Sequence, residues 1–261
     1  MIPKIIHYCW FGGNKLPPLA TKCIKSWKKY CKGYRIIRWD ESNFDIASAP
    51  LYVRHAYEAK KWAFVSDYVR LWAMVNYGGI YMDTDVEVVK PLDVFLKHKA
   101  FSGFEDKKNV PTGIMACEKN FPLFVEFLHY YDDALFYDDY GNITYVTNVT
   151  IITNACLELG LVQNNQKQVI EDFTLYPNDF FCPKSYADGI VYKTNNTVTI
   201  HHFNSSWHSK EENKRKKAKW RERQKKQKIK KKKEKRKRRR SKIKNLFIYV
   251  FGENIYKRIR G

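Results

Sequence analysis

The sequence lacks the features that usually direct a chain into or across a membrane. No apolar run approaches the roughly 18 to 20 residues of a membrane span. The start, MIPKIIHYCW, has neither the positive first region nor the long apolar core of a signal peptide. The six cysteines contain no C-x-x-C pair, which favours reduced, buried or inert thiols. We therefore expect a cytosolic protein.

The sequence also lacks an even distribution of charge. The formal net charge is +21. Residues 210–261 hold 26 Lys+Arg and 5 Asp+Glu, whereas residues 1–209 hold 22 of each. The basic character therefore describes a tail, and it says nothing about the chemistry of the body. We divide the chain into a folded domain (1–208), a basic low-complexity segment that is helical or disordered (209–244) and an amphipathic segment (245–261).

Hydrophobic residues, at 44% of the sequence, are numerous enough for one large α/β domain. Residues 4–11 and 34–39 are predicted strands, and residues 19–30 between them have helical spacing, so the chain opens as β-α-β. Residues 56–77 predict one helix that Gly78 and Gly79 end. We expect a hairpin at 190–200, around Asn195 and Asn196.

The stretch GGIYMDTDVEV at residues 78–88 places Asp83 and Asp85 directly after a short apolar run. Carboxylates of this kind hold Mg²⁺ or Mn²⁺, often together with substrate phosphates. On a regular strand the two side chains would point to opposite faces. Both can reach one ion only if the chain turns at Thr84 or if one carboxylate acts through water. A polar turn at a strand end is the plainer interpretation of the same residues.

Other polar residues support a binding site that includes Asp83 and Asp85. Asp67 and Arg70 are three residues apart and share a face of an otherwise apolar helix, which indicates a pocket more than a surface ion pair. His201 and His202 follow a late predicted strand, whose alternation turns at most one of them toward any given site. Trp10, at the end of the first strand, could be a core residue or a ligand contact.

Taken together, the motifs A-x-x-S-D-x-x-R, G-G-x-Y-x-D-x-D and a late H-H-x-x-x-S-W resemble one glycosyltransferase family. It contains the yeast initiating mannosyltransferases and bacterial capsular and lipopolysaccharide sugar transferases, and it is more distantly similar to the catalytic domains of clostridial glucosylating toxins. The resemblance covers most of residues 1–208. It implies a GT-A, Rossmann-like α/β fold with a mixed, mostly parallel sheet. It also implies a nucleotide-sugar donor, with UDP as the expected nucleotide, Mn²⁺ or Mg²⁺, and retention of the anomeric configuration.

The same resemblance assigns roles to individual residues. Trp10 would stack on the donor base, and Asp67 and Arg70 would hold the sugar hydroxyls and organise the reacting centre. Asp83 would contact the ribose and the metal or its water, and Asp85 would bind the metal directly. His201 or His202 would complete the metal shell. Ser205 and Trp207 would close over the diphosphate.

The basic tail suits a polyanion. We favour an anionic membrane surface on the inner face of the cell membrane, because each Lys or Arg there contributes about 1 kcal/mol and the amphipathic end adds an apolar anchor. Nucleic acid is disfavoured, since no base-reading module is visible. The expected acceptor is a glycan or lipid-linked glycan in surface polysaccharide synthesis. The alternative is a polyanion-binding or nucleic-acid-binding protein with an inactive glycosyltransferase-like body.

Overall fold

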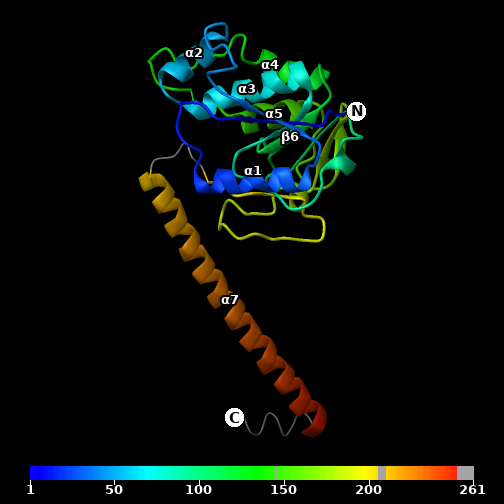
Figure 1. Cartoon of the computed structure of the whole chain (residues 1–261). Helices are drawn as coiled ribbons and strands as arrows, with labels where there is room; N and C mark the ends of the chain where they lie inside the picture. The colour runs from blue at the N-terminus through cyan, green and yellow to red at the C-terminus, as the bar shows by residue number, and fades with distance from the viewer. Residues whose placement is uncertain (145, 205–209, 252–261) are drawn as a thin grey trace. The chain divides into compact units, whose positions relative to one another are not determined.

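The computed structural model describes residues 1–144, 146–204 and 210–251 of the chain (Figure 1). These residues divide into two compact units. The first contains 1–186 and 191–209, and the second contains 187–190 and everything from residue 210 onward. Among the described residues, no helix is both long enough and apolar enough to cross a membrane.

The first unit is built on a seven-stranded sheet in the order β2-β1-β3-β6-β5-β8-β7, and β4 and β9 form a separate pair. The strands are β1 Ile5–Cys9, β2 Arg35–Trp39, β3 Gly79–Met82, β4 Val86–Val88, β5 Ala100–Gly103, β6 Ile114–Cys117, β7 Gln168–Ile170, β8 Phe173–Tyr176 and β9 Thr199–His201. The helices are α1 Pro18–Tyr30, α2 Leu51–Glu58, α3 Trp62–Tyr77, α4 Pro122–His129, α5 Asn148–Glu158 and α6 Asn178–Phe181, with a short 3-10 turn, η1, at Asp93–Phe95.

The sheet is mixed. Strands β2, β1, β3, β5 and β8 run in one direction, and β6 and β7 run in the other. The expected β-α-β opening is present as β1, α1 and β2, with β1 and β2 parallel. The expected mixed, mostly parallel sheet is therefore confirmed.

Two hydrophobic clusters cover the two faces of the sheet. Along β3, Tyr81 packs into the cluster that α2 to α5 supply, and Ile80 and Met82 pack into the cluster that contains Trp27 of α1. Figure 1 shows α2 to α5 on one side of the sheet and α1 on the other. A strand buried on both faces needs a continuous apolar sequence, which explains the run that precedes Asp83.

Two expectations about the elements are wrong. Residues 56–77 are not one helix. The helical conformation is interrupted at Lys60, which has a positive φ of 56°, and α2 and α3 lie on either side of this interruption. Residues 190–200 do not form a hairpin around Asn195 and Asn196. Their last residues join β9, which pairs antiparallel with β4.

The end of α3 agrees with the expected glycine pair. The Gly78 N–H donates to the Met74 carbonyl, and Gly78 and Gly79 have φ values of 62° and 112°. A β-carbon on Gly78 would lie 2.6 Å from the Lys119 backbone nitrogen. Glycine is the residue that tolerates both conditions, so this pair lets β3 start directly after α3.

The second unit consists of the helix α7, Lys210–Phe251, and the short segment 187–190. The two contact each other: Arg223 and Gln224 donate hydrogen bonds to the carbonyls of Ala187 and Asp188, and Gln227 donates to the Asp188 carboxylate. Basic residues occupy all sides of α7 over most of its length. Ile243, Leu246 and Val250 are more than half exposed near its end.

Candidate active site

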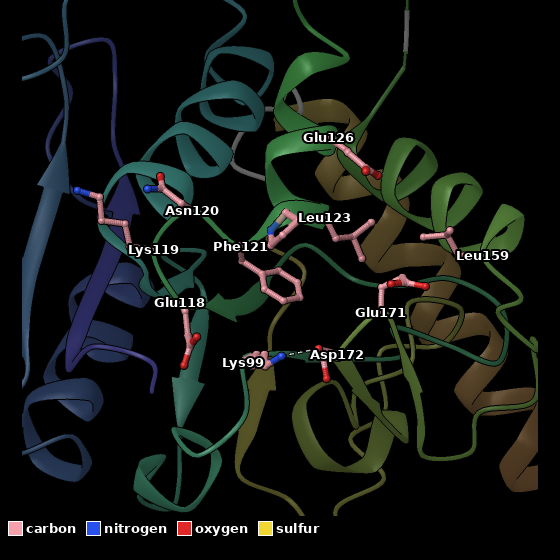
Figure 2. Close-up of a pocket in the computed structure, with 11 residues that line it drawn as sticks. Lys99, Glu118, Lys119, Asn120, Phe121, Leu123, Glu126, Leu159, Glu171 and Asp172 are labelled. Carbon is pink, nitrogen blue, oxygen red and sulfur yellow. Dashed lines mark hydrogen bonds and ion pairs between the residues drawn. The ribbon is translucent and has the colours of Figure 1, made fainter.

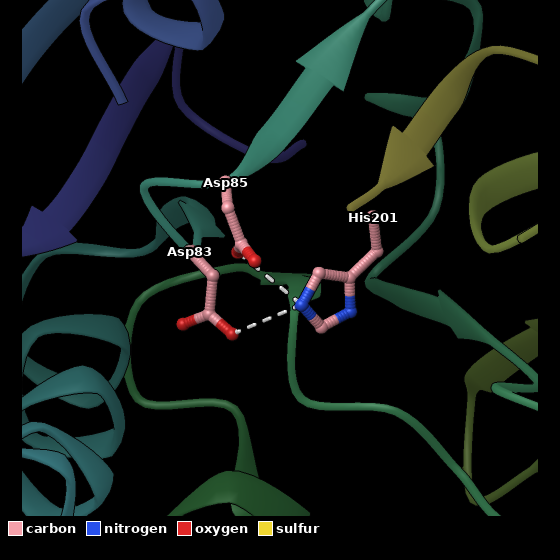
Figure 3. Close-up of side chains that lie close together, drawn as sticks. All are labelled: Asp83, Asp85 and His201. Atoms are coloured by element: carbon pink, nitrogen blue, oxygen red, sulfur yellow. Dashed lines mark ion pairs between the residues drawn. The ribbon is translucent and has the colours of Figure 1, made fainter. Parts of the chain in front are cut away.

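Asp83 and Asp85 leave β3 through a tight turn. Residues 84 and 85 form that turn, and the Val86 N–H donates to the Asp83 carbonyl at 2.9 Å. The turn removes the strand alternation that would have separated the two side chains. Both carboxylates consequently point to the same place, at the end of β3 (Figure 3).

The third group at this place is His201, from the end of β9. The register of β4 and β9 sets His201 opposite Val86. His201 Nε2 lies 3.3 Å from Asp85 Oδ1 and 3.9 Å from Asp83 Oδ2. One potential ligand atom from each of the three residues lies within 4.8 Å of the other two. His201 is more than 110 residues from the two aspartates in the sequence, and the pairing of β4 with β9 brings it to them.

The electrostatics show what this group is suited to bind. Burial alone would lower the pKa of His201, but the charge of Asp85 and the hydrogen bond to it raise that pKa well above 6.5. Burial alone would raise the pKa of Asp85, but His201 and the Asn204 N–H lower it to about 2. A positive charge is therefore stabilised between two carboxylates. Two carboxylate oxygens and one imidazole nitrogen fit a divalent cation such as Mn²⁺ or Mg²⁺.

The structure separates the two histidines. His202 Nε2 lies 2.8 Å from Glu87 Oε2, which also pairs with Lys22 Nζ at 3.0 Å. Successive side chains on a strand point to opposite sides, so the residue after His201 faces away from the aspartates. Of these two histidines, His201 is the one whose ring nitrogen lies close to Asp83 and Asp85, which makes it the candidate metal ligand.

Asp67 and Arg70 join the same site from α3. Arg70 Nη1 lies 3.2 Å from Asp67 Oδ1, and Arg70 Nη2 lies 3.2 Å from Asp83 Oδ1. Asp67 and Arg70 are 8% and 6% exposed, so the pair is buried, as a pocket requires and a surface pair would not be. Burial raises the pKa of Asp67 against the opposing charge of Arg70. The buried guanidinium therefore links the two carboxylates and orients both.

Two further residues at this site, Tyr81 and Asn148, are not predicted from the sequence. Tyr81 donates its hydroxyl hydrogen to Asp83 Oδ1 at 2.9 Å, and its ring lies 4.7 Å from the Arg70 guanidinium carbon. Asn148, which is fully buried, donates its side-chain N–H to the Asp67 carbonyl at 2.6 Å and its backbone N–H to Asp67 Oδ2 at 3.3 Å. Strand period 2 places Tyr81 on the face of Asp83 and could have identified it. No sequence signal identifies Asn148.

Trp10 lies at the same edge of the sheet as this site. Trp10 directly follows β1, which is parallel to β3, so Trp10 and Asp83 lie at the same edge of the sheet. The Trp10 indole N–H donates to the Asn14 carbonyl at 2.6 Å. Ser205 and Trp207 lie outside the described residues. Asn204, the last described residue before them, donates its N–H to Asp85 Oδ2 at 2.6 Å.

A pocket of about 410 Å³ lies elsewhere in the domain (Figure 2). Its lining includes Glu118, which follows β6, and the ion pair of Lys99 with Asp172. Because Cys117 of β6 pairs with Gly79 at the start of β3, this pocket is at the opposite end of the strand from Asp83. It is separate from the site of the three converging residues.

Sequence comparisons find similarity between this chain and glycosyltransferases. Residues 17–102 match a family model described as a glycosyltransferase sugar-binding region containing a DXD motif. An uncharacterized glycosyltransferase, L373 of Acanthamoeba polyphaga mimivirus, is 27% identical over 213 residues, 75% of this chain and 82% of that protein. Inositol phosphoceramide mannosyltransferase 3 of Schizosaccharomyces pombe is 27% identical over 132 residues, 48% of this chain but only 36% of the yeast protein.

Solved structures of glycosyltransferases are also similar at low identity. The PaToxG glycosyltransferase has a TM-score of 0.46 at 18% identity, over 60% of this chain and 68% of that one. The galactosyltransferase LgtC, in complex with donor and acceptor sugar analogs, has a TM-score of 0.43 at 13% identity, over 82% and 95% of the two chains. The sequence matches, and the convergence of the two motif aspartates at the end of β3, indicate that this chain is a glycosyltransferase similar to those with a DXD-containing sugar-binding region.

Proposed function

We propose that this glycosyltransferase depends on a divalent metal and moves a sugar from a UDP-sugar to a glycan or lipid-linked glycan acceptor, with retention of configuration. The observation that carries the proposal is the convergence of Asp83, Asp85 and His201, with Arg70 in contact with Asp83. The donor nucleotide and the retention rest on the family resemblance. Mn²⁺ or Mg²⁺, held by Asp83, Asp85 and His201, would act as a Lewis acid on the diphosphate.

The residues of the chain prepare the donor for loss of its diphosphate. Trp10, at the same edge of the sheet, would stack on the base. Asp67, fixed by Arg70 and Asn148, would accept hydrogen bonds from sugar hydroxyls and hold the sugar as it becomes oxocarbenium-like. Ser205 and Trp207 would close over the diphosphate and exclude water, which would otherwise hydrolyse the donor.

The tail extends the proposal to an anionic membrane surface on the cytoplasmic side. Its support is the charge of residues 210–261, 26 Lys+Arg against 5 Asp+Glu, and the exposed Ile243, Leu246 and Val250. These three are spaced i, i+3 and i+7 and share one side of α7. In the amphipathic segment (245–261), Phe247, Phe251, Ile255 and Ile259 are four residues apart, a spacing that predicts a second apolar face. Their side chains lie outside the described part of the chain. Long-range attraction by the charges and insertion of the apolar side chains would act together.

A donor screen tests the catalytic proposal. The full chain is mixed with a panel of nucleotide sugars and Mn²⁺, and released nucleoside diphosphate is measured with and without a chelator. We expect release from at least one donor, which the chelator stops. Asp85→Ala should abolish release without unfolding the protein, because Asp85 belongs to a turn and not to the hydrophobic core.

The matched control is Asp139→Ala, which removes an exposed aspartate between α4 and α5 and should leave turnover unchanged. Normal turnover by Asp85→Ala would contradict the assignment of Asp85 as a metal ligand. No turnover of any donor, together with tight binding of a nucleic acid, would favour the alternative of a polyanion-binding protein with an inactive body.

A further inference from the structure

The ring of His201 rests directly on the backbone of Gly113, the residue before β6. A β-carbon at position 113 would lie 2.7 Å from His201 Nδ1, 3.0 Å from Cε1 and 3.3 Å from Cγ. Contacts under 3.0 Å force something to move, and here the obstacle is the ring of His201, whose side chain is 14% exposed. The backbone of Gly113 is outside the left-handed region. Glycine is therefore required at this position for space and not for its conformational freedom.

The same short segment also holds the other members of the site. The Gly113 carbonyl accepts a hydrogen bond from the Asp83 N–H at 2.8 Å. The neighbouring carbonyl of Thr112 accepts one from Arg70 Nη1 at 3.4 Å. Residues 112 and 113 thus fix the backbone of Asp83, the side chain of Arg70 and the ring of His201 relative to one another.

His201 has little freedom to avoid a side chain at position 113. Its backbone is held in β9 by the pairing with Val86, and the following His202 N–H donates to the Asp85 carbonyl at 3.0 Å. The ring of Phe203, a buried residue, lies 4.3 Å from the His201 ring centroid to centroid. With the backbone fixed and Phe203 packed against the ring, displacement would have to change where Nε2 points.

We propose that Gly113 is a positioning residue: its missing side chain seats the His201 imidazole so that Nε2 faces Asp83 and Asp85, and thereby sets the affinity of the site for a divalent cation. The inference rests on the proposed metal dependence. It goes beyond that proposal because Gly113 offers no ligand atom of its own to the ion. It also predicts that any larger residue at position 113 weakens the site through the histidine.

A double-mutant cycle on the full chain tests this inference, with Mn²⁺ alone as the probe. The dissociation constant of Mn²⁺ is measured from the electron paramagnetic resonance signal of the free ion for four proteins: wild type, Gly113→Ala, His201→Ala and the double variant. Circular dichroism checks the fold of each. Non-additivity in such a cycle reports direct coupling between two residues.

We expect Gly113→Ala to weaken Mn²⁺ binding at least about tenfold, which is a typical loss for a disturbed supporting residue of a metal site. In the His201→Ala background, where the ring is gone, the same substitution should change the dissociation constant less than about twofold. Equal effects in both backgrounds, or wild-type affinity in Gly113→Ala, would overturn the inference while leaving the proposed metal site standing.

The remaining outcomes are also decisive. If Gly113→Ala fails to fold and the double variant folds, the ring is the obstacle, as proposed. If both fail to fold, the obstacle lies elsewhere and the inference is wrong. If the wild-type protein binds no Mn²⁺, the proposed metal dependence itself fails, and the inference fails with it.

Discussion

At the scale of single residues, the two oxygens of Asp83 have different tasks. Oδ1 accepts the hydrogen bonds of Tyr81 and Arg70, and Oδ2 faces His201. This division orients the carboxylate before any ligand arrives. A carboxylate that is already held in place loses less entropy when it binds a cation. Tyr81 and Arg70, on the Oδ1 side, should therefore matter for activity although they do not face the cation.

Tyr81→Phe isolates this contribution, because it removes the hydroxyl group and keeps the ring beside Arg70. Hydrogen bonds to charged groups contribute about 1.5–3 kcal/mol, so we expect kcat/KM for the donor to fall roughly 10-fold to 100-fold. Thermal unfolding monitored by circular dichroism checks that the fold persists. Tyr140→Phe, at a side chain that is 90% exposed, is the control. Unchanged kcat/KM in Tyr81→Phe would show that Asp83 needs no such support.

The raised pKa of His201 has a consequence for metal binding. The raised pKa favours a proton on the imidazole of the free site at neutral pH, and a metal requires that nitrogen deprotonated. Mn²⁺ binding should therefore release close to one proton at pH 7, and affinity should rise with pH. Calorimetric titrations in buffers of different ionisation enthalpy measure the number released.

His202→Gln provides the matched control for this experiment. Burial lowers the pKa of His202, which faces Glu87, so its removal should leave the number of released protons unchanged. His201→Gln should remove the release along with most of the affinity. Binding of Mn²⁺ by the wild type with no proton released would contradict a role for His201 Nε2 as a ligand.

Much of the site is predictable from local sequence, and the rest is not. Asp67 and Arg70 are three apart on one helix, and Asp83 and Asp85 share one turn, so their proximity follows from short-range geometry. His201 is different, since its place depends on the register of β9 against β4. That register is set by contacts more than 100 residues apart, which the order of side chains along one strand does not reveal.

At the scale of elements, local patterns again predict the features that depend on nearby residues and miss those that depend on distant ones. The apolar runs of β1 and β2 and the helical spacing of α1 identify the opening β-α-β unit. The break at Lys60 is missed because the apolar spacing of α2 and α3 is continuous across it, and the change of direction depends on one residue with positive φ. The expected hairpin at 190–200 is wrong because the end of this segment forms β9, which pairs with β4, a strand more than 100 residues away in the sequence.

His7 of β1 makes hydrogen bonds to β2 and to the end of α3, and its burial makes stability depend on pH. Its Nε2 lies 2.8 Å from the Gly78 carbonyl at the end of α3, and its Nδ1 accepts the indole N–H of Trp39 from β2 at 3.1 Å. Burial lowers the pKa of this ring from 6.5 to about 4. The folded protein thus keeps His7 neutral where the unfolded chain would protonate it.

The sign of this effect follows from proton linkage. Because the unfolded state binds the proton more tightly, stability is greatest above about pH 6.5 and falls progressively as the pH drops toward 4. Each pKa unit corresponds to about 1.4 kcal/mol. Between pH 7 and pH 5, we expect the unfolding free energy of the wild type to fall by about 2 kcal/mol more than that of His7→Gln. Urea unfolding at the two pH values measures both, and equal losses would contradict the assignment.

At the scale of the whole molecule, charge and catalysis are assigned to different parts of the sequence. Residues 1–209 carry no net charge, and residues 210–261 carry all +21. The site residues of the first unit do not depend on α7 for any of the contacts described above. We therefore expect the tail to determine where the enzyme acts and to leave the cleavage of the donor unchanged.

Truncation after His208 tests this separation. The shortened protein should lose binding to anionic lipid vesicles in a sedimentation assay and retain donor hydrolysis. Vesicle binding by the full chain should weaken with added salt, since screening shortens the range of the charges. Persistent vesicle binding by the truncated protein would refute the anchor.

A companion variant separates charge from apolar insertion. Substituting Ile243, Leu246 and Val250 by serine retains every basic residue of α7 and removes the exposed apolar stripe. If both signals are needed, this variant should bind anionic vesicles more weakly than the full chain does. Affinity equal to that of the full chain would show that the charges act alone.

The most direct test of the account is anomalous diffraction from crystals soaked with Mn²⁺ and UDP. We predict one manganese peak between Asp83 Oδ2, an Asp85 carboxylate oxygen and His201 Nε2, with the diphosphate on its open side. A peak bound elsewhere, or a diphosphate that is well ordered while these three side chains hold no metal, would contradict it.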